Sequence, residues 1–409
     1  MTGLEEIRSE AARRFAERGF PTPREEEWRF TNVAPIAKLN FAPAEDAGRG
    51  LDEELRAELE RLGWGGLRLV FVDGRFSPQL SSARFPRGVT AGPLLGADGT
   101  AGRHLARHAA YQEHPFVAWN TASFSDGAFL EVAPGTVLEE PIELIYLISR
   151  ADRPVVSHPR SLVLAGRASQ LALVEVYAGR GPDYLSNAVT EIVAAEGAVL
   201  DYYKLELEDL GGFHVGTVQL EAARDVNLST CAVSLGGKLV RNEVNIVLGQ
   251  GASATLNGLY VASGTQHIDN RTFVDHAEPN GTSFELYKGI LDGRASGVFN
   301  GKILVRQPAQ KTDAKQTNKN LILSKEAVIN TKPELRIFAD DVRCTHGATV
   351  GQIDREAIFY LTSRGIGERE ARELLTLAFA RDILDRIRLE PLRAWLDARL
   401  WEKFHGYGG

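Results

Sequence analysis

Two side chains that can bind a metal or act as a nucleophile lie two positions apart near the end of the chain. They are Cys344 and His346, in the run Asp340-Asp-Val-Arg-Cys-Thr-His346. Because side chains alternate along a β-strand, an unbroken strand would place Asp340, Val342, Cys344 and His346 on one face. A thiolate beside an imidazole suits zinc, copper or an iron-sulfur cluster, and such a pair can also form an activated nucleophile. Two ligands do not complete a site that needs four, so the alternative is a buried cysteine beside a hydrogen-bonding histidine.

A second set of candidate ligands is His267 and His276, which flank Asp269 and Asp275. Their spacing of nine residues fixes no geometry at the ends of strands. A stand-alone metal site would need both histidines together with the thiol and imidazole near the chain end. Such a protein would bind metal without any partner.

Several common catalytic motifs are absent from the sequence. The nucleotide-binding loop Gly-x-x-x-x-Gly-Lys-Ser/Thr does not occur, so we expect the chain neither to bind nor to hydrolyse nucleotide by itself. There is also no Gly-x-Ser-x-Gly elbow and no Cys-x-x-Cys pair. The other cysteine, Cys231, lies in an apolar run and is expected in the core.

Composition and charge narrow the possible roles further. Of the 409 residues, 44% are hydrophobic and 25% charged, as is ordinary for a soluble protein. The net charge of -7 argues against nucleic acid, because binding phosphates needs clustered Lys and Arg. The longest apolar runs are far shorter than the roughly 20 residues of a membrane helix. Residues 1–10 carry three glutamates where a secretory signal would be cationic and then apolar, so we expect a cytoplasmic protein with reduced cysteines.

Residues 116–361 repeat one short unit, an alternating apolar run followed by a corner of Gly, Asn, Asp or Ala. One example is the run 203–208, where Tyr203, Leu205 and Leu207 alternate with polar residues that we expect to face water. Stacked units of this kind predict a mainly β fold, and we favour a parallel β-helix over a sandwich because Asn-Gly and Asp-Gly hairpin turns are few. The recurrent corners are 165–169, 195–199, 249–253, 279–283, 292–296, 324–328 and 346–350.

The ends of the chain are predicted to be helical. Apolar spacing predicts helices over residues 4–18, 51–62 and 105–112, a hairpin over 67–76 around Asp73-Gly74, and a linker over 91–102. The expected domains are a cap of residues 1–102, a β-helix core of 103–362 and a helical domain of 363–409. The core is expected to open with an array segment that begins at Phe116.

The predicted helix over 371–387 is apolar on more than one face, so it is buried on more than one side. One face can pack on the array while the other meets a partner. The alternative is a terminal subdomain of helices, including one that begins near Pro391, that pack only on each other. The apolar residues that a partner would contact are Leu374, Leu375, Leu377, Phe379 and Ile383.

Segments at both ends and in the middle resemble the SufB and SufD family of SUF iron-sulfur cluster assembly scaffolds. The strongest is the carboxy-terminal signature that contains Cys-Thr-His-Gly-Ala-Thr-Val-Gly, whose form is similar to the SufD branch of the family. The segments that carry the resemblance are 27–32, 120–127, 311–324, 330–335, 340–354 and 358–366.

The resemblance implies a non-enzymatic scaffold with a right-handed parallel β-helix between helical ends. It implies a complex with the paralogue SufB and the ABC-type ATPase SufC, which would dock on the carboxy-terminal helices. The cluster would form transiently at the SufB interface, where His346, with Cys344 beside it, matches this chain's contribution and SufB supplies the missing ligands. ATP binding would bring two SufC subunits together and twist the pair so that the site is assembled or exposed. Whether the isolated chain pairs with itself is left open.

A competing interpretation is a β-helix enzyme that acts on polysaccharide. Such enzymes carry clustered acids and an arginine in a long groove, and no such cluster is evident in the sequence. The stand-alone metal-binding protein described above is the other alternative.

Overall fold

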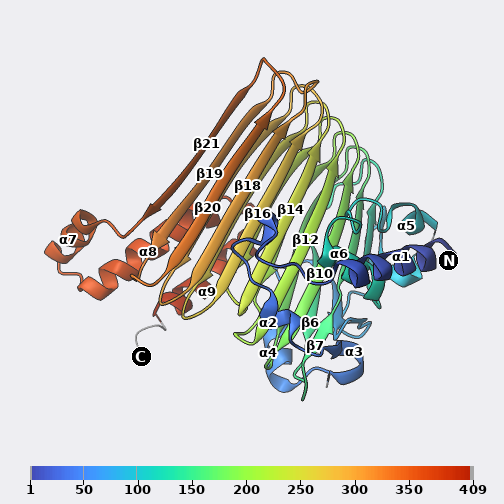
Figure 1. Ribbon diagram of the computed structural model, residues 1–409, viewed down its shortest axis with the longest axis horizontal. Helices are drawn as coiled ribbons and strands as arrows, with labels where there is room; N and C mark the ends of the chain where they lie inside the picture. The colour runs from blue at the N-terminus through green and yellow to red at the C-terminus, as the bar shows by residue number, and fades with distance from the viewer. Residues whose placement is uncertain (1, 49, 98, 406–409) are drawn as a thin grey trace.

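The computed structural model describes residues 2–48, 50–97 and 99–405, and two long sheets of mainly parallel strands dominate it (Figure 1). Sheet A contains β4 (Val89–Pro93), β5 (Gly127–Val132), β8 (Arg160–Ala165), β10 (Tyr184–Ala194), β12 (Gly212–Ala222), β14 (Leu239–Leu248), β16 (His267–His276), β18 (Ser296–Val305) and β20 (Val328–Ile337), with β1 (Ala42–Pro43) and β7 (Val155–Ser157) attached. Sheet B contains β3 (Arg75–Phe76), β2 (Leu67–Val72), β6 (Ile142–Ile148), β9 (Gln170–Gly179), β11 (Val199–Glu206), β13 (Asn227–Ser234), β15 (Ser253–Ala262), β17 (Thr282–Leu291), β19 (Asp313–Ile322) and β21 (Arg343–Gly351).

From β8 onward, successive strands alternate between the two sheets, so each coil contributes one strand to each sheet. Among the strands from β8 onward, neighbours within a sheet are parallel, and the residue offset between them in sheet A ranges from 26, where Phe213 lies beside Leu239, to 32, where Ser296 lies beside Val328. The aliphatic core lies between the sheets and runs along the coils. The predicted mainly β fold, a β-helix between helical ends, is therefore confirmed.

Six of the seven predicted corners are turns between strands, and several contain a residue in the left-handed region, such as Gly197 with φ 69° and Asn280 with φ 64°. The seventh, 346–350, is wrong. These residues lie inside β21, where Thr317 of β19 pairs with Gly347. A glycine in a run of small residues can mark a turn or an extended strand, and here parallel pairing with β19 keeps the backbone extended.

The alternation of apolar and polar residues predicted the strands, but it did not always predict which face of a strand is exposed to solvent. Lys204, Glu206 and Glu208 were expected in water, yet each is at most 2% exposed and points into the solenoid. Tyr203 and Leu205 point outward and pack beneath α4 (Glu53–Arg61), α8 (Glu368–Leu384) and α9 (Glu390–His405), which cover that part of sheet B. The covered outer face takes the apolar side chains, so the polar ones pair with each other inside.

Around the amino terminus, α1 (Thr2–Arg18) and α4 lie where helices were expected, and β2 and β3 form the expected hairpin. Asp73 and Gly74 have φ values of 52° and 80°, as a two-residue hairpin turn requires. The predicted linker over 91–102 is instead structured and includes α5 (Gly99–His104). The remaining short elements are η1 (Glu26–Trp28), α2 (Ala34–Ala37), α3 (Ala44–Ala47) and η2 (Leu94–Gly96).

The predicted helix over 105–112 and the array segment beginning at Phe116 are also wrong. The helix here is α6 (Pro115–Ser123). Its first residue is a proline, whose fixed φ suits the first helical position. Residues 105–112 form turns in which the buried carboxylate of Glu191 accepts the N–H groups of Ala106, His108 and Ala109 at 2.8 to 3.0 Å. A side chain from sheet A thus replaces the carbonyl acceptors of a helix.

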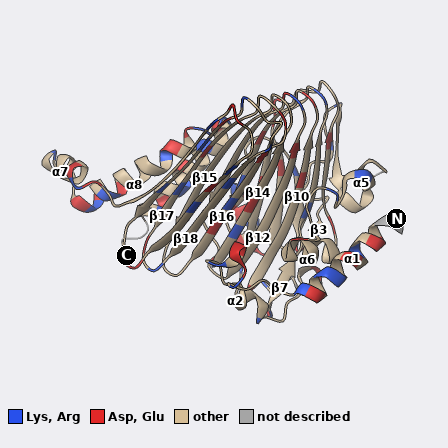
Figure 2. Cartoon of the chain, turned by 45° about the horizontal axis from the view of Figure 1, so that its top comes forward, with Lys and Arg blue, Asp and Glu red and all other residues tan. Residues whose placement is uncertain are grey.

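At the carboxy terminus, residues 355–361, which were expected in the array, belong to the helix α7 (Arg355–Ser363). It begins at Asp354, whose carboxylate accepts the N–H of Glu356. Figure 1 shows α7 and the start of α8 projecting beyond the last strands, while α9 lies along the solenoid. Acidic and basic residues are interspersed over the visible face (Figure 2). Among the described helices, none combines the length and apolar character needed to cross a membrane.

Candidate functional site

The strand β21 ends sheet B and carries the candidate ligands. Its residues pair with β19 on one side only, so that Cys344 lies beside Ala314 and His346 beside Gln316. The two side chains are on the same face, as the sequence predicted. Asp340 and Val342 precede the first strand residue, Arg343, so the predicted four-residue face reduces to the cysteine and the histidine.

Cys344 is partly buried. Its side chain packs against a small apolar cluster at this end of the core, made of Ile303, Val305, Ala309, Ala314 and Ala339. Burial raises the pKa of the Cys344 thiol, with a smaller opposing effect from a backbone hydrogen bond of Ala314. The free thiol is therefore protonated at neutral pH, and a metal ion must displace that proton in order to bind sulfur.

His346 is exposed, because no further coil covers the last strand. Behind it on β19 lies Gln316, which is 1% exposed and donates to Glu285 at 2.7 Å. The imidazole can therefore be approached from solvent or by another chain, with a polar, well-packed neighbour on the inner side. This arrangement suits a ligand that is shared across an interface.

The other candidate ligands do not join this pair. His267 and His276 lie at opposite ends of β16, and a nine-residue extended separation is roughly 30 Å. His267 contacts the hydroxyls of Thr31 and Ser296 at 2.9 and 2.7 Å. Within the described ranges, no group of three or more His, Cys, Asp or Glu side chains is placed to hold a metal ion. A four-ligand site at His346 would therefore need groups from outside the described residues.

His276 instead makes stability depend on pH. It is fully buried, its Nε2 lies 2.9 Å from Ser283 Oγ, and burial lowers its pKa to about 4 despite Asp275. In the unfolded chain an imidazole binds a proton near pH 6.5, so the unfolded state gains stability relative to the folded state as the pH falls below that value. Through this histidine, the free energy of unfolding of the wild-type chain should fall by about 2 kcal/mol between pH 7 and pH 5. His276→Gln should not show this part of the decrease, as measured by urea unfolding at each pH.

The matched control for that measurement is His405→Gln, in the more exposed last turn of α9. Comparing the two variants separates the loss of the buried imidazole from the loss of a partly exposed one. Equal pH dependence of the wild-type chain and the His276 variant would show that the buried imidazole does not titrate in this range.

The amino-terminal signature residues hold the cap against sheet A. The guanidinium of Arg241 lies 3.5 Å from the ring centre of Trp28, and Thr31 donates to Asp269 at 2.5 Å. Asn120 donates to the carbonyl oxygens of Pro159 and Asn187, both at 2.8 Å. Trp28 and Thr31 thus hold the cap, and Asn120 holds α6, against sheet A.

The residues predicted to meet a partner on α8 divide into two groups. Leu377 and Ile383 are buried against the outer face of sheet B. Leu374, Leu375 and Phe379 are only partly buried. Leu375 and Phe379 line a cleft of about 310 Å³ between α8, α7 and the end of β21, with Val350, Ile353 and Ala357 among its other walls.

The sequence interpretation missed two exposed aromatic residues next to this cleft. Phe359 and Tyr360 on α7 are 74% and 59% exposed. The sequence did contain a signal for the start of α7. Asp354 precedes an apolar run, and aspartate is a favoured helix N-cap residue.

Family models and named relatives match most of the chain. Residues 146–379 match the family model described as SUF system FeS cluster assembly, SufBD core domain, and residues 1–144 match that of the SufBD protein N-terminal region. The chain is 33% identical over 390 residues to an iron-sulfur cluster assembly SufBD family protein of Synechocystis sp., an alignment that covers 92% of this chain and 86% of the relative. It is 30% identical over 392 residues to the iron-sulfur cluster assembly protein SufD of Escherichia coli, with 95% and 90% covered.

A third relative, the iron-sulfur cluster assembly protein SufD of Bacillus subtilis, is 27% identical over 289 residues, with 69% of this chain and 65% of the relative covered. The two family models together span the cap, the solenoid and most of α8. The chain therefore belongs to the SufBD family of iron-sulfur cluster assembly proteins.

Proposed function

We propose that this chain is a non-catalytic scaffold subunit that pairs with SufB, binds the ATPase SufC, and contributes His346, with Cys344 beside it, to a nascent cluster at the SufB interface in the cytoplasm. The observation that carries the proposal is the position of His346, exposed on an edge strand at the open end of the solenoid. The relatives named SufD support the same role.

The open end has the properties of a docking surface. β20 and β21 end their sheets, so each presents unpaired backbone N–H and C=O groups that can pair with another chain. The same end exposes several large apolar side chains, of which Phe338 is 64% exposed. Ile337 lies next to it in the chain, whereas Val328 lies at the other end of β20 and Val350 lies near the end of β21. Exposed apolar side chains along two uncovered edge strands favour a partner that covers both strands.

The incomplete ligand set supports a shared site. Cys344 and His346 supply at most two ligands, and a protonated, partly buried thiol is the weaker of the two. A second chain that docks on β21 would bring its own side chains beside His346. The cluster is then cargo of the assembly, and this chain needs no nucleotide site of its own.

For SufC, the surface with the best support is the cleft of Leu375 and Phe379 together with the exposed aromatic residues of α7. The helix α7, which carries these aromatic residues, projects beyond the last strands and follows β21 in the chain (Figure 1). ATP-driven movement of a protein docked here would act on the strand that carries His346. This continuity connects the ATPase cycle to the cluster site in the proposal.

The decisive test is co-expression with SufB and SufC followed by mass measurement of the purified assembly. Truncation after Ser363 would be a poor probe, because it removes α8 and α9 residues that are buried on sheet B. Leu375→Asp is sharper, since it places a charge in the partly buried cleft. We expect this variant to retain SufB and to lose SufC by at least about tenfold in band intensity, because a charge desolvated in an apolar contact costs several kcal/mol.

The control for this variant is Arg372→Gln on the same helix, where the exposed arginine pairs with Glu368. It should retain both partners. Retention of SufC by Leu375→Asp would refute the docking surface. If the wild-type chain ran alone at its own mass beside SufB and SufC, the scaffold proposal itself would be overturned.

A further inference from the structure

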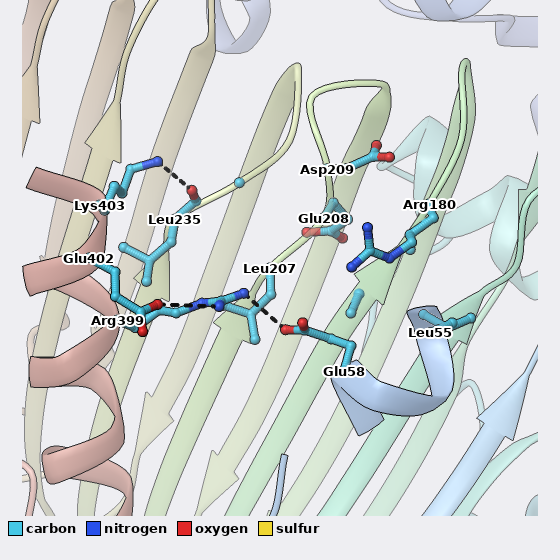
Figure 3. Close-up of a pocket in the computed structure, with 13 residues that line it drawn as sticks. Leu55, Glu58, Arg180, Leu207, Glu208, Asp209, Leu235, Arg399, Glu402 and Lys403 are labelled. Atoms are coloured by element: carbon cyan, nitrogen blue, oxygen red, sulfur yellow. Dashed lines mark hydrogen bonds and ion pairs between the residues drawn. The ribbon is translucent and has the colours of Figure 1, made fainter. Parts of the chain in front are cut away.

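The polar side chains between α4 and α9 join the two ends of the chain. Arg399 donates to Glu58 at 3.0 Å and lies 3.7 Å from Glu402 (Figure 3). Lys403 donates to the carbonyl oxygen of Leu235 at 3.0 Å. These contacts hold α4, α9 and the turn after β13 together, so their role is structural.

Two histidines at the other end of the solenoid from β21 face each other directly (Figure 1). His104 is the last residue of α5, and His108 lies in the turn that follows. The Nδ1 atom of His104 lies 3.4 Å from Nε2 of His108. Both residues are partly exposed, and His108 borders a cleft of about 830 Å³ between η1, residues 108–115 and sheet A. The pair can therefore be reached from solvent.

The two imidazole rings meet edge to edge. Their planes are 13° from parallel, and their centres are 5.7 Å apart. Each nitrogen lies less than a bond length from its own ring centre. Centres this far apart, with nitrogens 3.4 Å apart, therefore put both nitrogens close to the line that joins the centres. The two nitrogens point at each other along one line, as in a linear N–H···N hydrogen bond.

Contacts with sheet A fix the turn that presents the two rings. Ala106, between the histidines, is in the left-handed region with φ 57°. The buried carboxylate of Glu191 accepts the N–H groups of Ala106 and His108 at 2.8 and 2.9 Å, and it pairs with Arg160 at 2.6 Å. Because the turn is already ordered, little conformational entropy is lost when an ion binds between the rings.

The head-on arrangement distinguishes between metal ions. Zinc takes four ligands at tetrahedral angles, so two imidazoles on one zinc ion converge at an angle instead of facing each other. The monovalent d¹⁰ ion Cu(I) accepts two ligands on opposite sides, and imidazole is a suitable ligand for copper. With about 2 Å between the metal and each nitrogen, the rings need to move apart by only about half an ångström.

The protonation of His104 suits metal binding. Burial lowers the pKa of His104, and the charges of His108 and Arg103 lower it further. At pH 7 this imidazole is therefore neutral, which is the form that binds metal. The carboxylates of Glu131 and Glu191 lie within electrostatic range of His104 and oppose the repulsion from Arg103.

We propose that His104 and His108 bind one Cu(I) ion in a linear, two-coordinate site. Without metal, one of the facing nitrogens donates its proton to the other. Binding requires only that the donor ring take its other tautomer, so that both facing nitrogens present lone pairs. Two ligands complete this site, unlike the site at His346. It shares no residue with β21 and needs neither SufB nor SufC, so it is independent of the proposed scaffold function.

The test is anaerobic titration of the full-length chain with Cu(I) against the chromophoric chelator bicinchoninate at pH 7. Thiols also bind Cu(I), so every titration uses the Cys344→Ser chain, in which the remaining thiol, Cys231, is buried. We expect one Cu(I) ion per chain. His104→Gln and His108→Gln should each weaken its binding by about tenfold or more, because each removes one of two ligands.

The matched control is His114→Gln. His114 borders the same cleft and is partly exposed, with its Nδ1 atom 3.8 Å from Glu243. Because it is not part of the pair, its replacement should leave the Cu(I) affinity unchanged. Equal affinities of the Cys344→Ser chain and its His104→Gln variant would overturn the proposal.

X-ray absorption at the copper edge tests the geometry without any substitution in the pair, so it does not depend on how the histidine variants fold. The Cys344→Ser chain loaded with one equivalent of Cu(I) should give a two-coordinate near-edge spectrum with nitrogen neighbours. A shell of three or four ligands, or a sulfur neighbour, would show that the ion does not lie between His104 and His108 in a linear site.

Discussion

Replacing His346 by alanine should lower the iron and sulfide content of the purified assembly by about tenfold or more, while the subunit composition stays unchanged. The imidazole is exposed on the edge strand, and no hydrogen bond or ion pair joins it to another described residue. Loss of groups around a metal commonly costs 10- to 100-fold in metal affinity, and loss of a ligand costs at least as much. The measurement is iron and sulfide per complex after anaerobic purification of the co-expressed subunits.

Two further variants sharpen this result. Thr345→Ala changes a neighbouring exposed residue on the opposite face of β21 and should retain the wild-type cluster content. Cys344→Ser should cost less than His346→Ala, because the thiol is partly buried in apolar surroundings that keep it protonated. Wild-type cluster content in His346→Ala would remove this residue from the site, even if the complex itself forms as proposed.

The second large effect concerns stability. Arg160→Leu should lower the free energy of unfolding by about 3 to 5 kcal/mol, because it leaves a buried carboxylate without its countercharge. Arg160 and Glu191 are fully buried and 2.6 Å apart, and the same guanidinium donates to Asn120 and Thr121 of α6. Burial opposes ionisation of Glu191, yet Arg160 and the N–H donors of residues 106–109 hold its pKa below the usual value. Urea unfolding at pH 7.5 measures the loss.

The controls separate the buried charge from the lost side chain. Arg167→Leu, in the turn that follows the same strand, should have little effect, since its pair with Glu196 is solvent-exposed. The double variant Arg160→Leu/Glu191→Gln should recover part of the loss, because no uncompensated charge remains. A loss in Arg160→Leu no larger than in Arg167→Leu would show that the buried pair does not stabilise the packing of α6 and residues 106–109 on the solenoid.

Much of the architecture could be predicted from local sequence patterns. Period-two runs and turn residues are properties of adjacent positions, so strands, six corners, the hairpin at Asp73-Gly74 and the long terminal helices followed from them. The pairing of Cys344 and His346 on one face has the same origin, because two residues on one strand always share a face when they are two positions apart.

Contacts between distant segments decided the rest. Lys204, Glu206 and Glu208 face inward because α8 and α9, from the end of the chain, cover the outer face of sheet B. Residues 105–112 are not helical because Glu191, more than 80 positions later, takes their N–H groups. No local period records which surface a distant segment will cover or which donor a distant carboxylate will bind. The sequence therefore determined the repeating β architecture and the placement of Cys344 and His346 on one face, and only the tertiary structure decided which side chains are buried, paired or left exposed.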